Sequence, residues 1–148
     1  MIWNIINRDD LFPSVLVSVR SPFEILGRAE VKDNIAVVSW HMPASITPSK
    51  YAISIPSDDP VRRMISRAGN FVINFMGYEQ RSIVLSAENQ DGLFVDLFEF
   101  LGLTKAESDY VESPRIREAK ACLECEVDKE FESGDHTIFL GRVVGPRV

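Results

Sequence analysis

The chain has 148 residues, of which 45% are hydrophobic, and it carries a formal net charge of −6. This size and composition favour one folded domain with a real core and exclude a disordered chain. The acidic balance argues against a general nucleic-acid-binding protein, because such a protein needs a basic surface. The sequence also shows neither a signal peptide nor an apolar run near the roughly 20 residues that cross a bilayer. We therefore expect a soluble, cytoplasmic protein that binds no membrane.

Six runs rich in β-branched and aromatic residues, each bounded by turn residues, predict β-strands. They are residues 14–20, 34–40, 51–56, 71–76, 121–131 and 136–144. Residues 24–31 are a further candidate, with 32–34 as the turn into the next strand. Residues 132–135 contain Gly134 and predict a hairpin between the last two runs.

Two segments have the apolar spacing of amphipathic helices. Asp59 and Pro60 suit the start of the first, and Gly69 suits its end. Between them, apolar residues recur at helical spacing: Val61, Met64, Ile65 and Ala68. Residues 93–101 carry a stripe of Leu and Phe, which predicts core packing or a subunit contact.

The remaining chain suits a short third helix within residues 77–90 and a polar surface connection over 104–117. Strands dominate, and helices do not alternate with every strand. The pattern therefore favours an antiparallel barrel decorated by helices over a parallel βαβ fold.

Cys122 and Cys125 form a C-x-x-C pair, a spacing that also occurs in redox and metal sites. The surrounding residues predict a strand, in which positions i and i+3 face opposite sides. We therefore expect two buried thiols that point apart in a reducing compartment, and no metal site.

The sequence contains no glycine-rich dinucleotide fingerprint, P-loop, nucleophile elbow or HExxH motif. Its two histidines, His41 and His136, both lie beside predicted strand ends, where barrel loops commonly meet ligands. A chain with so few nucleophile motifs is expected to take its chemistry from a cofactor.

Five stretches follow one another in a characteristic order. They are "FPSVLVSVR" (12–20), "NIAVVSWHMPASITPSKYAISIP" (34–56), "GNFVINF" (69–75), "ESPRIREAKACLECEV" (112–127) and "SGDHTIFLGRVV" (133–144). In this order they resemble the flavin reductase-like family of FMN-binding split barrels, which includes flavoredoxins. The resemblance covers about residues 12–144.

The resemblance implies a mainly β, six-stranded antiparallel Greek-key split barrel with two to three short helices. It implies a homodimer that binds FMN near the dimer interface. Such a protein passes a hydride from NAD(P)H to flavin, or relays electrons through FMN to a redox-protein partner. Many members continue well past "GRVV", so a single domain over residues 1–148 would lack their longer C-terminal tail.

The resemblance also implies the residues of the site. Residues 41–50 would form a proline-braced rim loop, and the flavin ring would meet Ser39, Trp40, His41, Met42, Pro43, Ala44, Ser45 and Thr47. The phosphate would be held near the helix start by Ser54, Ser57, Arg62, Arg63 or Lys50, although Asp58 and Asp59 there would repel it. His136, in "GDH", would be the catalytic residue that orients the ring or the nicotinamide. Asn74 would shape the site by hydrogen bonding.

Two other functions stay open on the sequence alone. One is a flavin-binding module without turnover, such as a storage or sensor protein. The other is a flavin-free dimeric interaction domain. With no dinucleotide fingerprint, the sequence does not distinguish NADH from NADPH.

Overall fold

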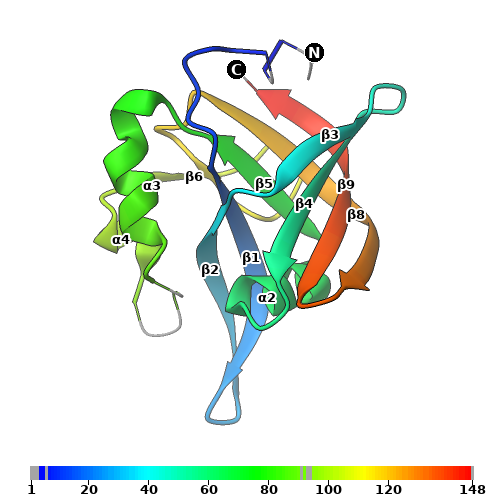
Figure 1. Ribbon diagram of the computed structural model, residues 1–148. Helices are drawn as coiled ribbons and strands as arrows, with labels where there is room; N and C mark the ends of the chain where they lie inside the picture. Colours follow the sequence, from blue (N-terminus) through cyan, green and yellow to red (C-terminus); the bar gives the residue numbers. More distant parts are fainter. Residues whose placement is uncertain (1–3, 6, 91, 93–94, 148) are drawn as a thin grey trace.

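The computed structural model describes residues 4–5, 7–90, 92 and 95–147 (Figure 1). Its main element is a seven-stranded antiparallel sheet in the order β2-β1-β5-β8-β9-β4-β3. The strands are β1 (Val15–Ile25), β2 (Arg28–Val38), β3 (His41–Ser45), β4 (Lys50–Pro56), β5 (Asn70–Phe75), β8 (Ala121–Ser133) and β9 (His136–Arg147). A separate ribbon pairs β6 (Lys105–Ala106) with β7 (Arg115–Ile116).

The sheet curls into a split barrel because a very short link joins its two edges. β2 and β3 stand at opposite ends of the strand order, yet only Ser39 and Trp40 separate them along the chain. Three Cα–Cα steps span at most about 11 Å, so the two edges must come close together. The predicted mainly β split barrel is confirmed, with seven strands in the main sheet where six were expected.

The additional strand is β3, which replaces the first half of the rim loop expected over residues 41–50. It pairs with β4, so that Met42 lies opposite Ala52 and Pro43 opposite Tyr51. Pro43 is tolerated because β3 is last in the strand order, where a missing N–H breaks no hydrogen bond to a further strand. The loop itself shrinks to residues 46–49.

The expected turn at residues 32–34 is also wrong. β1 and β2 pair without interruption around a two-residue turn at Leu26 and Gly27, which have φ angles of 52° and 76°. Positive φ at both positions is typical of the type I′ turn that suits the twist of a hairpin. Asp33 instead lies within β2, opposite Arg20 of β1.

The barrel has an apolar core inside it and a second apolar cluster outside it. Along β1 the side chains alternate, so Val15, Val17 and Val19 join the inner core while Leu16 joins the outer cluster. The outer cluster is covered by α3 (Arg81–Ala87), which follows the 3-10 turn η1 (Tyr78–Gln80), and by α4 (Leu97–Phe100). The expected third helix in residues 77–90 is therefore present.

The helix that packs on the inner core is α2 (Pro60–Ala68), at the lower end of the barrel in Figure 1. Asp59 caps it by accepting a hydrogen bond of 2.8 Å from the Val61 N–H, and Gly69 ends it with a φ of 75°. Leu97 and Phe98 of the stripe expected over 93–101 are buried in α4, whereas Leu93 and Phe94 lie outside the described residues. No helix in the described ranges is long and apolar enough to cross a bilayer.

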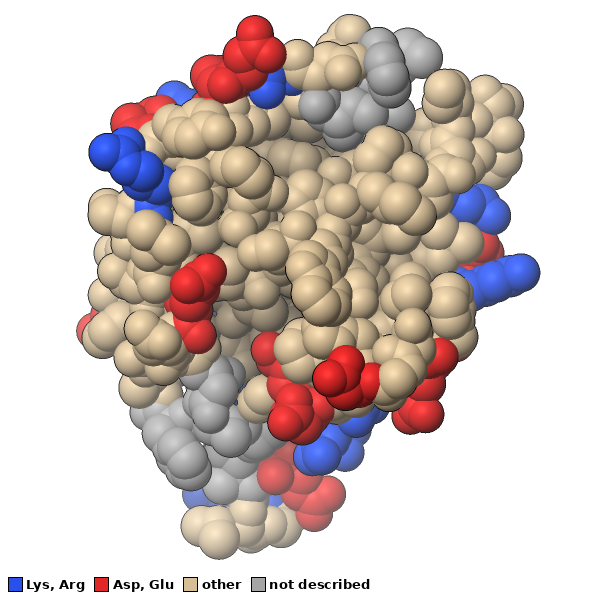
Figure 2. All heavy atoms as spheres, in the orientation of Figure 1, with Lys and Arg blue, Asp and Glu red and all other residues tan. Residues whose placement is uncertain are grey.

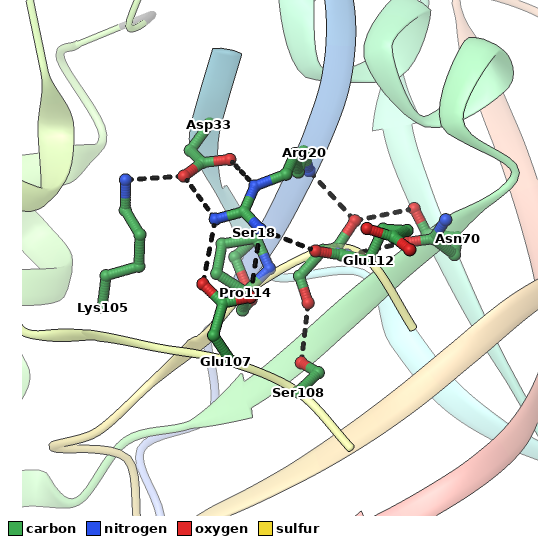
Figure 3. A network of polar contacts seen from close by, with 10 residues as sticks. Ser18, Arg20, Asp33, Asn70, Lys105, Glu107, Ser108, Glu112 and Pro114 are labelled. Atoms are coloured by element: carbon green, nitrogen blue, oxygen red, sulfur yellow. Dashed lines mark hydrogen bonds and ion pairs between the residues drawn. The ribbon is translucent and has the colours of Figure 1, made fainter. Parts of the chain in front are cut away.

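Residues 104–117 are more than the polar surface connection that was expected, since Ile116 of β7 is fully buried. An ionic network fastens this segment to the sheet (Figure 3). Arg20 contacts Asp33 at 2.8 Å and Glu107 at 3.1 Å, and Lys105 contacts Asp33 at 2.6 Å. Asp33 thus joins β1, β2 and β6.

We predict that Asp33→Asn lowers the free energy of unfolding at neutral pH by about 1–3 kcal/mol, because it weakens charge-assisted hydrogen bonds to a carboxylate that is only 10% exposed. Burial alone would raise the pKa of Asp33, but hydrogen bonds from Arg20 and Lys105 outweigh it and hold that pKa below its usual value. A lowered folded-state pKa stabilises the protein above the unfolded value of about 3.9. That contribution disappears as the pH falls through the folded-state pKa. Urea denaturation at several pH values should therefore show the difference between wild type and variant shrinking in acid; a constant difference would contradict the prediction.

Candidate functional site

His41, the first residue of β3, has both ring nitrogens engaged by protein groups. Its Nε2 lies 2.6 Å from the carbonyl oxygen of Pro13, and its Nδ1 lies 2.7 Å from the hydroxyl of Tyr51. A carbonyl only accepts, so Nε2 carries a hydrogen, and in the neutral ring Nδ1 accepts the Tyr51 O–H. Burial raises the pKa of Tyr51 to about 12, so that its hydroxyl keeps its proton. His41 therefore joins β3, β4 and the segment before β1.

The barrel closes at the link between β2 and β3, here called the seam, and Trp40 of this link meets His136. Their rings stack with centroids 4.5 Å apart and an angle of 25° between planes. Trp40 is held by its backbone, whose carbonyl accepts from the Ser54 N–H at 2.9 Å, and 64% of the residue is exposed. His136 starts β9, and its Nδ1 lies 2.7 Å from a carboxylate oxygen of Asp135. This bond holds the pKa of Asp135 below its usual value.

Ser57 follows β4 and contacts both neighbours of His136. Its N–H donates to the Asp135 carbonyl at 2.9 Å, and its hydroxyl lies 2.9 Å from that of Thr137. The Ser57 carbonyl in turn accepts from Nε of Arg62 in α2, also at 2.9 Å. The end of β4, the start of α2 and the start of β9 are thus bound together at one end of the barrel (Figure 1).

A groove of about 290 Å³ lies beside this junction. It is lined by residues of α2 and its N-terminal loop together with one residue of β1: Glu24, Ser57, Asp58, Asp59, Pro60, Arg62, Arg63, Met64 and Arg67. Basic and acidic side chains are equally numerous there. Asp59, however, uses one carboxylate oxygen to cap α2, whereas Arg63 is exposed. The groove therefore offers arginine side chains to an anion, while Asp58 in the same lining opposes it.

Several expected site residues lie far from this junction. β4 has seven residues and runs from Lys50 at one end to Pro56 at the other, so Lys50 and Ser57 are about 20 Å apart along an extended chain. Lys50 instead pairs with Asp128 at 2.8 Å. Ser45 and Thr47 lie at the same end as Lys50. One phosphate cannot be shared between the two ends.

The other expected residues divide between the seam and the core. Met42, Pro43 and Ala44 are exposed along β3, Ser54 is half-buried in β4, and the hydroxyl of Ser39 lies 2.7 Å from that of Ser14. Asn74 is fully buried, and its amide donates to the Leu16 carbonyl at 2.8 Å. Its Oδ1 accepts from the Ile116 N–H at 2.9 Å. Asn74 therefore ties β5 to β1 and β7 inside the protein.

The C-x-x-C pair consists of two free buried thiols. Cys125 belongs to the inner core, while the Cys122 thiol donates to Oδ1 of Asn74 at 3.3 Å. Burial raises the pKa of Cys122 to about 11 and raises that of Cys125 further above its usual value. Neither thiol is therefore a ready nucleophile. Within the described ranges no group of three or more His, Cys, Asp or Glu side chains could hold a metal ion.

Comparison with known proteins identifies the family of this chain. A family model described as the flavin reductase like domain matches residues 13–148. The chain belongs to the flavin reductase like family. An uncharacterized protein of Archaeoglobus fulgidus is 34% identical over 113 residues, which are 76% of this chain and 64% of the relative. The NADH-dependent FMN reductase AsuE2 of Streptomyces nodosus subsp. asukaensis is 29% identical over 121 residues, 80% of this chain and 62% of AsuE2. The chain thus spans less than two thirds of either relative.

Solved structures share the fold. The flavoredoxin of Desulfovibrio vulgaris (Miyazaki F) matches 95% of this chain and 73% of its own, with a TM-score of 0.79 and 24% identity. The NADH:FAD oxidoreductase SgcE6 of Streptomyces globisporus C-1027 matches 93% of this chain and 77% of its own, with a TM-score of 0.75 and 22% identity. At such identities the likeness establishes the split barrel and no finer property.

Membership of the flavin reductase like family supports a flavin-related oxidoreductase, and the chemistry of the junction fits such a cofactor. An exposed indole offers a flat apolar face, the imidazole of His136 offers a polar edge, and Arg62 and Arg63 supply positive charge. The sequence prediction did not include Asp135 or Tyr51. The sequence did contain a signal for Asp135, because this residue adjoins His136 in "GDH". The sequence contained no signal for Tyr51, since its contact with His41 forms only when β3 and β4 pair.

We predict that Tyr51→Phe lowers the free energy of unfolding by about 1 kcal/mol, because His41 loses the hydrogen bond to its Nδ1. A double-mutant cycle with His41→Phe, measured by urea denaturation, should show a coupling of similar size. Tyr78→Phe, at a residue that is 46% exposed, is the control and should change stability little. Equal effects of Tyr51→Phe and Tyr78→Phe would contradict the assigned bond.

Proposed function

We propose that this protein binds FMN and passes a hydride to the flavin from NADH or NADPH, or relays electrons through bound FMN. The observation that carries the proposal is the meeting of Trp40 and His136 at an exposed seam of a flavin reductase like barrel. The similarity to an NADH-dependent FMN reductase supports it.

A bound flavin supplies the redox chemistry, because it accepts a hydride and releases electrons. The protein's own residues bind and orient it in this proposal. Trp40 offers the face of an indole to a planar ring, and His136 offers its imidazole at the edge. Arg62 and Arg63, at the start of α2, hold the phosphate, where helix N–H groups also favour an anion. Asp58 opposes this binding and weakens it.

The proposal includes a cytoplasmic homodimer with the flavin near the interface, and a redox-protein partner if the protein relays electrons. Figure 2 shows that charged side chains are sparse at the centre of the face bearing β3 and β4 and gather at its margins. Trp40 and Met42, at 64% and 60% exposure, are large apolar residues near the edge strand. Burying them against a second copy would be favourable. Light scattering that gives a monomeric mass at micromolar concentration would contradict the dimer.

We predict that the purified protein, loaded with FMN, loses its yellow colour when NADH or NADPH is added without oxygen. Absorbance at the flavin bands is the measurement. Bleaching by either nucleotide supports direct reduction. Binding of FMN without bleaching by either nucleotide contradicts the reductase and leaves the relay or a storage role. Failure to bind any flavin contradicts the whole proposal and favours a flavin-free interaction domain.

We predict that Arg63→Gln weakens FMN binding by about 10-fold, the size expected for one lost charge-assisted hydrogen bond, and leaves riboflavin binding unchanged. Fluorescence titration of both flavins makes the comparison, since riboflavin lacks the phosphate. Lys50→Gln is the matched control, because Lys50 lies at the other end of β4. A selective loss of FMN affinity in Lys50→Gln would show that the phosphate is bound elsewhere.

A further inference from the structure

The backbone around His136 is held by strand pairing with Pro56 of β4 and Ser133 of β8, and by one further residue, Ser57. Ser57 reaches across to both neighbours of His136, with its N–H at the Asp135 carbonyl and its hydroxyl at Thr137, each at 2.9 Å. Ser57 is itself held through its carbonyl by Nε of Arg62. The start of α2 therefore adds, through Ser57, to the strand pairing that positions the His136 backbone.

The imidazole ring of His136 is fixed as well. Its Nδ1 faces the Asp135 carboxylate at 2.7 Å, and one face of the ring lies against Trp40 at 4.5 Å between centroids. An ionised carboxylate only accepts, so Nδ1 carries a hydrogen. The side chain of His136 is 19% exposed, and its Nε2 is the ring nitrogen that this contact leaves for a ligand.

We infer that Trp40, Asp135 and Ser57 are positioning residues that hold the His136 imidazole in one orientation, with Nδ1 protonated and Nε2 turned to the flavin or nicotinamide. The inference rests on the proposed function for the identity of that ligand. A group that orients a ring during hydride transfer must itself be oriented, because a misplacement of about 1 Å can cost on the order of 100-fold in rate. Stacking restrains the plane of the imidazole, the carboxylate selects its tautomer, and Ser57 restrains its backbone.

This inference gives two residues a role besides the one that the sequence predicted for them. Ser57 and Arg62 were expected to bind phosphate. Ser57 uses its N–H, its hydroxyl and its carbonyl within the junction, and Arg62 uses Nε there. Arg63 is one residue further along α2 and makes no hydrogen bond to Ser57 in the part of the chain that the structure describes. Of the two arginines, Arg63 is therefore the better placed for an anion.

Nuclear magnetic resonance of the protein without flavin tests the inference, because the chain has only two histidines. With 15N-labelled imidazoles at about pH 8.5, where an ordinary histidine is neutral, the nitrogen shifts report which nitrogen carries the proton. We expect Nδ1–H for His136 and Nε2–H for His41, whose ring serves as the internal reference. His136→Gln assigns the signals. Nε2–H for His136 in the wild type would overturn the inference.

Five variants separate the contributions, and the tautomer of His41 should be unchanged in each. Asp135→Ala should shift His136 towards the Nε2–H tautomer. Trp40→Leu should abolish the ring-current shift of the His136 ring protons, and Trp40→Phe should retain it. Arg62→Gln should move the His136 signals, whereas the matched control Arg63→Gln should not. Unchanged His136 signals in Asp135→Ala, Trp40→Leu and Arg62→Gln would overturn the positioning role.

A kinetic measurement then connects the geometry to the reaction. In the FMN-loaded protein, Asp135→Ala should lower kcat on the order of 10-fold with little change in KM for the nucleotide, as expected when orientation rather than binding is lost. If the resonance results hold but the wild type does not oxidise NADH or NADPH, the reductase part of the proposed function fails and the positioning of His136 stands. If the wild type is active and Asp135→Ala changes the His136 tautomer without changing kcat, the catalytic relevance of the positioning is overturned.

Discussion

The two-residue link between β2 and β3 is the constraint on which the rest of this structure depends. Ser39 and Trp40 connect strands at opposite ends of the sheet order, so the sheet has to curl until its edges meet. The same link carries Trp40 out of the regular strands and exposes its indole. Barrel closure and the candidate flavin surface are therefore consequences of one short connection.

The two histidines near that seam have different physical roles. Both ring nitrogens of His41 are hydrogen-bonded, to Pro13 and Tyr51, which leaves this side chain little capacity to bind a ligand. His136 hydrogen-bonds Asp135 through Nδ1 and stacks on Trp40, so that its Nε2 stays available to a ligand. Residue type alone made both candidates for a site. Their hydrogen-bond partners distinguish the histidine that fastens the fold from the one whose second ring nitrogen stays open to a ligand.

The geometry of β4 also sorts the residues that were expected to bind phosphate. An extended strand of seven residues separates Lys50 from Ser57 by about 20 Å, although both looked like members of one site in the sequence. The acidic residues of the same region take a more limited role than their charge indicated, since Asp59 caps α2. The remaining candidates for an anion gather on α2, where Arg62 and Arg63 adjoin the residues that hold His136.

The sequence by itself determined six of the seven strands of the main sheet, the start and end of α2, the closing hairpin and the family, because these depend on local periodicity, capping residues and short motifs. It also indicated that Cys122 and Cys125 point apart, since strand alternation is a local property. Only the structure decided that residues 41–45 form a strand, since pairing with β4 across the loop 46–49 outweighs two prolines and three serines nearby. Only it moved Asn74 into the core and brought Asp135 and Ser57 around His136. Contacts between residues about 80 positions apart, such as Ser57 and Thr137, arise from the pairing of β4 with β9, and no local pattern records them.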